Sequence, residues 1–147
     1  MSQLLPRIIL SFIACLTMLT LSVPANAKED KSLGLYVNLS TDDNVKAGHA
    51  FVHAGKMMKR GHPVTYFLNG KAVLIAVKGV PQTSFNGKSL QVLLKSAIAK
   101  GAKVLICRVC MKLHDIKPDQ LIDGAVRANP ELTSNYLFDP SYRVISW

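Results

Sequence analysis

The alternation of short apolar runs with amphipathic segments is the feature that most restricts the fold of this 147-residue chain. Residues 33–39, LGLYVNL, form a short apolar run that ends at the turn-forming sequence STDDN, as a buried strand does. Residues 45–60 then place apolar side chains three and four positions apart, which predicts an amphipathic helix. Strands that alternate with helices need crossover connections, and these favour a parallel sheet with helices on both faces.

The same alternation continues toward the middle of the chain. Residues 63–70, PVTYFLNG, predict a second strand that ends at an Asn-Gly turn. Ser89 has the position of a helix N-cap, and residues 103–107, KVLIC, predict a strand directly after that helix. The order of these elements is typical of an α/β protein.

The remaining segments complete this prediction with less detail. Residues 71–79, KAVLIAVKG, are nearly all apolar, and their pattern fits a short helix or a strand. Pro118 predicts another short helix that includes DQLIDGAV, and residues 142–147, YRVISW, predict a closing strand. The expected fold class is therefore α/β, a three-layer sandwich in which helices flank a mainly parallel sheet of about five strands.

The first 27 residues have the pattern of a secretory signal peptide. Arg7 precedes an uncharged, mainly apolar stretch, and Ala25-Asn26-Ala27 matches a small-residue cleavage site. The apolar stretch approaches the length of a membrane span, but Pro24 and the cleavage site favour removal. We therefore predict a signal peptide over residues 1–27 and one domain over residues 28–147. The expected location is periplasmic or secreted, and the cleaved chain is not an integral membrane protein.

The predicted mature chain is basic. It has 17 Lys and Arg residues against 9 Asp and Glu residues, a net charge of about +8. The basic residues are scattered singly and lack the interleaved aromatic residues of a platform for single-stranded nucleic acid. The charge therefore indicates anionic small molecules, an acidic partner or the membrane surface, and not nucleic acid.

Two cysteines, Cys107 and Cys110, remain after cleavage, because Cys15 lies within the signal peptide. If residues 108–113 begin a helical turn, Cys107 lies near the N-cap and Cys110 in the first turn. Backbone N–H groups and the helix dipole stabilise a thiolate there, and Arg108 adds a positive charge. The pair also follows a strand, where ligands gather in parallel sheets. We interpret Cys107 as a nucleophile and Cys110 as its resolving partner.

The C-x-x-C pair allows other interpretations. Haem attachment needs a histidine where Met111 stands. A disulfide that closes so short a loop adds little stability, so a structural staple is possible but of small benefit. A metal site needs more ligands than two thiols; His49 and His53 have a suitable spacing but share their helix face with basic residues. The sequence thus predicts no cofactor and no metal, while a metal- or anion-binding module and a thiol-disulfide redox protein stay as alternatives. His114 is near enough to act as a proton partner.

The chain resembles the DsrE/DsrF-like sulfur-relay family, in particular its exported YchN-like members. The resemblance runs from about Leu33 to Trp147. It rests on the first strand with its continuation STDDNVKAGHAFVHAGKMMKRGHPVTYFLNGKAV, and on SLQVLLKSAIAKGAKVLICRVCMKLHDIKPDQLIDGAV. It implies an α/β fold, homo-oligomers that are trimers or hexamers, and a cysteine that accepts sulfane sulfur as a persulfide. By position that cysteine is Cys107, and some relatives have a C-x-x-C that includes the position of Cys110.

The function implied by the resemblance is that of a small exported sulfur carrier or sulfurtransferase. Its partners would be a sulfur donor or acceptor protein, or a small sulfur anion. Two features depart from the family pattern. The family's sulfur relays work in the cytoplasm, whereas this chain begins with an export signal, and a full C-x-x-C also permits ordinary dithiol-disulfide exchange.

Overall fold

The computed structural model describes residues 30–147, so the predicted signal peptide and Cys15 lie outside the described residues. The elements in chain order are β1 (Gly34–Leu39), α2 (Asn44–Lys59), β2 (Val64–Leu68), the 3-10 helix η2 (Gly70–Ala76), β3 (Ser84–Phe85), β4 (Lys88–Ser89), α3 (Leu90–Ala99), β5 (Lys103–Ile106), α4 (Arg108–Leu113), the 3-10 helix η3 (Pro118–Gln120), β6 (Ala125–Arg127), α5 (Pro130–Leu137) and β7 (Tyr142–Ser146).

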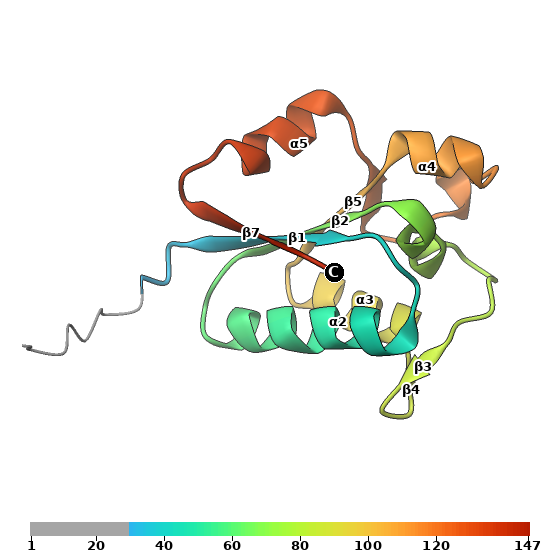
Figure 1. Cartoon of the computed structure of the whole chain (residues 1–147), viewed down its shortest axis with the longest axis horizontal. Helices are drawn as coiled ribbons and strands as arrows, with labels where there is room; N and C mark the ends of the chain where they lie inside the picture. Colours follow the sequence, from blue (N-terminus) through green and yellow to red (C-terminus); the bar gives the residue numbers. More distant parts are fainter. Residues whose placement is uncertain (1–29) are drawn as a thin grey trace, which may run out of the picture.

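Five strands form one sheet in the order β6-β5-β2-β1-β7. Every neighbouring pair in this sheet is parallel, and β3 and β4 form a separate antiparallel pair. Helices α2 and α3 cover one face of the sheet, while α4 and α5 lie over the other (Figure 1). The structure therefore confirms the predicted α/β sandwich.

The helices on the first face begin within one residue of the predicted positions. The Asp43 carboxylate accepts hydrogen bonds from the backbone N–H groups of Val45 and Lys46, at 3.1 and 2.9 Å, and so caps α2. The Ser89 hydroxyl accepts from the Val92 N–H at 3.2 Å and caps α3. These caps satisfy N–H groups that have no partner within the helix.

The main core lies between the sheet and these two helices. The ring of Phe51 on α2 packs against Tyr66 on β2, with 5.4 Å between ring centroids. Apolar residues of α2, η2, α3 and the inner strands are nearly excluded from solvent around this contact, among them Leu39, Ala50, Leu68, Ile75, Leu94 and Ile106. No helix within residues 30–147 has the length and apolar character needed to cross a membrane.

Some segments differ from the sequence predictions. The ambiguous run after Asn69 is the 3-10 helix η2, and the segment between η2 and α3 contains the β3–β4 pair. The helix predicted from Pro118 is limited to η3, because the next residues pair with the end of η2: the Ile122 N–H donates to Ala76 O at 2.8 Å. After this pairing, a turn at Asp123 and Gly124 leads into β6. Helix α5 was not predicted.

Two glycines on α2 lie in opposite environments and give a matched prediction. A Cβ atom at Gly48 would overlap the Phe85 ring, whereas one at Gly55 would meet nothing within 4 Å. We expect Gly55→Ala to stabilise the protein by about 0.5–1 kcal/mol, because glycine is a poor residue inside a helix. We expect Gly48→Ala to destabilise it by about 1–2 kcal/mol, because the hairpin that carries Phe85 must shift. Urea unfolding of both variants measures the difference, and equal effects would contradict this account of α2.

Candidate functional site

The two cysteines lie at the carboxyl end of β5, an inner strand of the sheet. The Cys107 N–H donates to Leu68 O at 2.9 Å, which continues the pairing of β5 with β2 by one residue. The chain then turns into α4, and the Cys107 sulfur accepts a hydrogen bond from the Cys110 N–H at 3.3 Å. Cys107 is thus the N-cap of α4, as the sequence predicts, and its own sulfur is the capping atom.

The structure brings the two thiols into direct contact. Both cysteines are free and half-buried, and the Cys110 S–H donates to the Cys107 Sγ at 2.7 Å. Burial raises the pKa of the Cys110 thiol, and its hydrogen bond to Cys107 acts in the same direction. Cys110 therefore keeps its proton at neutral pH and donates it in a hydrogen bond to the Cys107 sulfur.

A backbone amide holds Cys110 from the opposite side. The Gly70 N–H, at the start of η2, donates to the Cys110 Sγ at 3.2 Å. Gly70 has a φ of +49°, and a Cβ there would lie 2.6 Å from Ser40 O. Glycine therefore allows the backbone of residue 70 to pass close to Ser40. The side chain of Asn69 fixes the same turn by donating to Asn38 Oδ1 at 2.6 Å. The Asn-Gly signal predicts the turn, but nothing in the sequence indicates that its amide reaches a sulfur.

A hollow of about 510 Å³ opens beside Cys107, between α4 and the start of α5. The exposed side chains of Arg108 and Lys112 line it from α4, and Phe67 lines it from β2. The first turn of α5 forms the opposite wall, with Asn129 as N-cap and Pro130 as the first helical residue. Helix α5 was not predicted from the sequence, although an Asn-Pro pair is a signal for a helix start. The hollow gives Cys107 access to solvent in a positively charged setting.

The histidines do not join the cysteines. His114 follows α4, its backbone N–H donates to Cys110 O at 3.1 Å, and within residues 30–147 no hydrogen bond joins its ring to either sulfur. The His49 ring lies 5.2 Å from that of Phe85, and the His53 ring 5.9 Å from that of Trp147. In the described part of the chain, no group of three or more His, Cys, Asp or Glu residues could hold a metal. A metal site that combines the thiols with a histidine of α2 therefore has no geometric support there.

The unequal surroundings of the two thiols predict an order of reaction. We expect iodoacetamide to modify Cys107 before Cys110 near neutral pH, because the raised pKa of Cys110 leaves little of its reactive thiolate. The difference should narrow as the pH is raised, because a higher pH increases the fraction of Cys110 that is present as thiolate. Peptide mass spectrometry after short reaction times measures both sites. Faster modification of Cys110 at neutral pH would refute this description of the pair.

A pair of thiols at the carboxyl end of an inner strand, in a wholly parallel five-stranded sheet, defines a small α/β protein with a thiol site. The DsrE/DsrF-like family matches residues 31–147, and the chain belongs to this family. The family and the fold predicted from the sequence are thereby confirmed.

Two solved structures share the fold. The YchN protein from E. coli is 17% identical, with a TM-score of 0.67 over 78% of this chain and 99% of its own. The protein of unknown function MTH1491 from Methanobacterium thermoautotrophicum is 9% identical, with a TM-score of 0.64 over the same shares of the two chains. No curated protein matches this chain in sequence.

Proposed function

We propose that this protein is an exported sulfur carrier or sulfurtransferase that holds sulfane sulfur as a persulfide on Cys107. The observation that carries the proposal is the Cys107 sulfur, which caps α4, accepts a hydrogen bond from the Cys110 S–H at 2.7 Å and opens to a basic hollow. Membership of the DsrE/DsrF-like family, which is associated with sulfur relay, supports the same function.

The loading step conserves atoms and charge. The Cys107 thiolate attacks the terminal sulfur of a polysulfide anion, a new S–S bond forms, and the S–S bond of the donor breaks. The donor leaves as an anion shorter by one sulfur, and Cys107 carries the outer sulfur as a persulfide. An acceptor thiolate then attacks that outer sulfur, takes it, and leaves Cys107 as the thiolate again.

Cys110 provides a second outcome for the persulfide. After it loses its proton, its thiolate can attack the inner sulfur of Cys107, which forms a Cys107–Cys110 disulfide and expels hydrosulfide. An external dithiol must then reduce this disulfide before the next cycle. Cys110 thus acts as the resolving residue.

The hollow restricts the partners of this site. Arg108 and Lys112 favour a negatively charged donor, and the volume of about 510 Å³ admits a small sulfur anion or a cysteine from a donor or acceptor protein. We infer no role for nucleic acid.

Location in the periplasm, or secretion, belongs to the same proposal and rests on the signal pattern of residues 1–27. N-terminal sequencing of the protein from fractionated cells tests it. A mature chain that begins at Lys28 is expected, whereas an uncleaved chain in the cytoplasm would contradict export.

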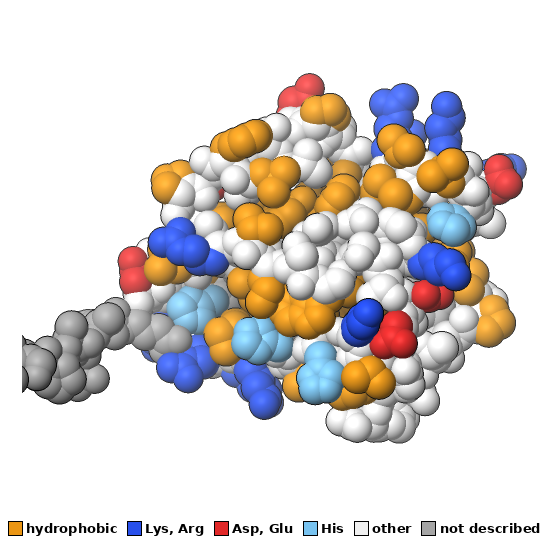
Figure 2. All heavy atoms as spheres, in the orientation of Figure 1, with side chains coloured by type: hydrophobic (Ala, Val, Ile, Leu, Met, Phe, Trp, Pro, Cys, Tyr) orange, Lys and Arg blue, Asp and Glu red, His pale blue; other side chains and the backbone are white. Residues whose placement is uncertain are grey.

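Self-association, as a trimer or hexamer, is also part of the proposal. Exposed apolar side chains occur on and next to the helices that flank the hollow: Val109 and Leu113 on α4, and Leu137 and Phe138 at the end of α5. Figure 2 shows apolar side chains gathered over this region of the surface. Such a patch is typical of a protein interface. Light scattering in solution tests this inference, and the mass of a single chain would contradict it.

The contact between the thiols also favours a second function, dithiol-disulfide exchange without sulfur transfer. The two sulfurs need only a small movement from 2.7 Å to form a bond. A reduction potential above about −300 mV is expected for a reactive couple, whereas a lower value indicates a structural disulfide.

The reaction with polysulfide tests the main proposal. We expect the reduced protein to gain about 32 Da on the peptide that contains Cys107, which is the mass of one sulfur atom. Trapping with iodoacetamide and peptide mass spectrometry locate the added sulfur. Reduced protein that never gains sulfur, although Cys107 alkylates readily, would leave dithiol-disulfide exchange as the better account.

A further inference from the structure

A second cavity lies on the opposite face of the sheet from the cysteines, in the groove between α2 and α3. Its volume is about 290 Å³, at the small end of the range for ligand pockets, about 300–1,000 Å³. The apolar lining comes from Phe51 and Met58 on α2 and from Leu93 and Ala97 on α3. We call this cavity the α2–α3 groove; its lining suits an apolar ligand body.

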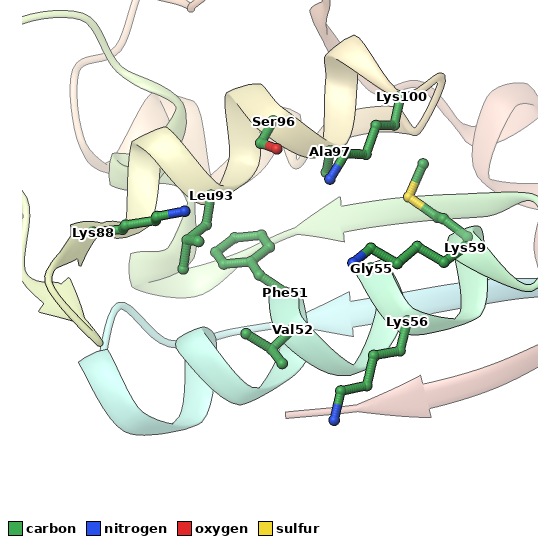
Figure 3. A pocket seen from close by; sticks show the side chains of 11 residues that line it. Phe51, Val52, Gly55, Lys56, Lys59, Lys88, Leu93, Ser96, Ala97 and Lys100 are labelled. Atoms are coloured by element: carbon green, nitrogen blue, oxygen red, sulfur yellow. The ribbon is translucent and has the colours of Figure 1, made fainter.

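Four lysines surround the α2–α3 groove. Lys56 and Lys59 come from α2, Lys88 from β4, and Lys100 from the C-cap of α3. Figure 3 shows the side chains of Lys59, Lys88 and Lys100 extending into the space between the helices, while Lys56 extends away from it. Lys59 and Lys100 thus place two charges at one part of the apolar groove, and Lys88 places a third at its other end.

No carboxylate neutralises these lysines within the described residues. The groove has no acidic residue in its lining, and the ion pair found in residues 30–147 is Lys78 with Asp123, at 3.5 Å, elsewhere on the surface. Neighbouring ammonium groups repel one another, and a bound anion relieves that repulsion. The charge of the groove therefore selects for a negative ligand.

Gly55 leaves the groove open. It lines the cavity from the interior of α2, and a Cβ atom there would meet nothing within 4 Å. Packing requires glycine at Gly48 but not at Gly55, where glycine weakens the helix. A larger side chain at this position would extend into free space in the groove, so the glycine keeps this space available.

We propose that the α2–α3 groove binds a small organic anion with an apolar body, such as an acyl or aryl carboxylate, sulfonate or phosphate. The apolar part lies on Phe51 and Leu93, and the charged group lies between the ammonium groups of Lys59 and Lys100, with Lys88 at the other end of the groove. This site is separate from Cys107 and does not depend on sulfur transfer.

Two fluorescent probes that differ in one group test the proposal. Anilinonaphthalene sulfonate has an apolar body and one negative charge, and phenylnaphthylamine is the same body without the sulfonate. In fluorescence titrations of the protein, we expect the sulfonate to bind at least about tenfold more tightly than the neutral probe, because the lysines attract its negative charge. Equal affinities for the two probes would overturn the proposed role of the lysines.

Matched variants locate the binding. We expect Lys59→Gln combined with Lys100→Gln to weaken binding of the sulfonate by about tenfold or more. The control combines Lys46→Gln on α2 with Lys95→Gln on α3. It also removes two positive charges, but at residues that do not line the groove. We expect this control to change the affinity by less than about twofold, since such charges act through screened solvent. Equal losses of affinity in the two double variants would show a general attraction of the probe to a basic surface and would overturn the proposal.

Gly55→Leu tests the apolar part of the site without changing charge. The added side chain occupies the groove, so we expect it to abolish saturable binding of the sulfonate probe, while thermal unfolding monitored by circular dichroism shows a folded protein. Folded Gly55→Leu that binds the probe as well as the original chain would place the probe elsewhere and overturn the proposal.

Discussion

We expect Cys107→Ser to abolish the uptake of sulfane sulfur, so that the gain of about 32 Da after incubation with polysulfide disappears. A serine hydroxyl stays protonated at neutral pH and is a poor nucleophile without an activating base. Serine is also a preferred N-cap residue, so it replaces the capping function of the Cys107 sulfur on α4. The loss then reports chemistry and not a broken helix. Intact mass spectrometry of the reduced, sulfur-treated variant measures it.

Cys110→Ser is the matched control for this variant. It removes the second thiol from the same short helix but leaves the proposed nucleophile in place. We expect it to take up sulfur and to hold it longer than the original chain does, because Cys110 is no longer present to expel hydrosulfide and form the disulfide. Sulfur uptake in Cys107→Ser, together with its loss in Cys110→Ser, would reverse the roles that we assign to the two cysteines.

Gly70→Ala is expected to destabilise the protein by about 3 kcal/mol. The residue combines a φ of +49° with a Cβ position 2.6 Å from the backbone oxygen of Ser40, so alanine adds both strain and a clash. Relief of the clash requires η2 to move, and this movement withdraws the Gly70 N–H from Cys110. Urea unfolding measures the change in stability. Alkylation kinetics of Cys110 measure the change at the thiol.

Gly79→Ala separates the two causes of this effect. Gly79 also has a positive φ, +76°, but a Cβ there would meet nothing within 4 Å. Strain alone is therefore expected to cost about 1–2 kcal/mol at Gly79, with no effect on Cys110. Equal losses of unfolding free energy in Gly70→Ala and Gly79→Ala would show that the contact with Ser40 does not contribute.

The parts of the fold that the sequence predicts are those with strong local signals. Asp43 and Ser89 have the side chains that cap helices, and they cap α2 and α3 in the structure. The apolar runs of β1, β2 and β5 are short and bounded by turns, and all three lie inside the sheet. The N-cap position of Cys107 follows from the same reasoning, because a strand that leads directly into a helix leaves one residue for the cap.

The other parts depend on contacts between distant segments. The helix that begins at Pro118 stops after Gln120 because Ile122 pairs with Ala76, and a pattern within the segment itself does not reveal this. The contact of Gly70 with Cys110 joins residues 40 positions apart in the sequence. The α2–α3 groove likewise combines lysines from α2, β4 and the end of α3, which line one cavity only when the helices are packed together.

The use of the Cys107 sulfur as the cap of α4 has a consequence for recognition. When this sulfur enters a new bond, the acceptor of the Cys110 amide changes in charge and shape. We therefore expect the geometry of the first turn of α4 to depend on the chemical state of the Cys107 thiol. Val109, in the same turn, is exposed on the surface. Under the proposed sulfur transfer, a protein that docks on α4 would distinguish loaded from empty Cys107 without touching the sulfur. Hydrogen exchange at the Cys110 amide, compared before and after loading, tests this coupling, and unchanged exchange would exclude it.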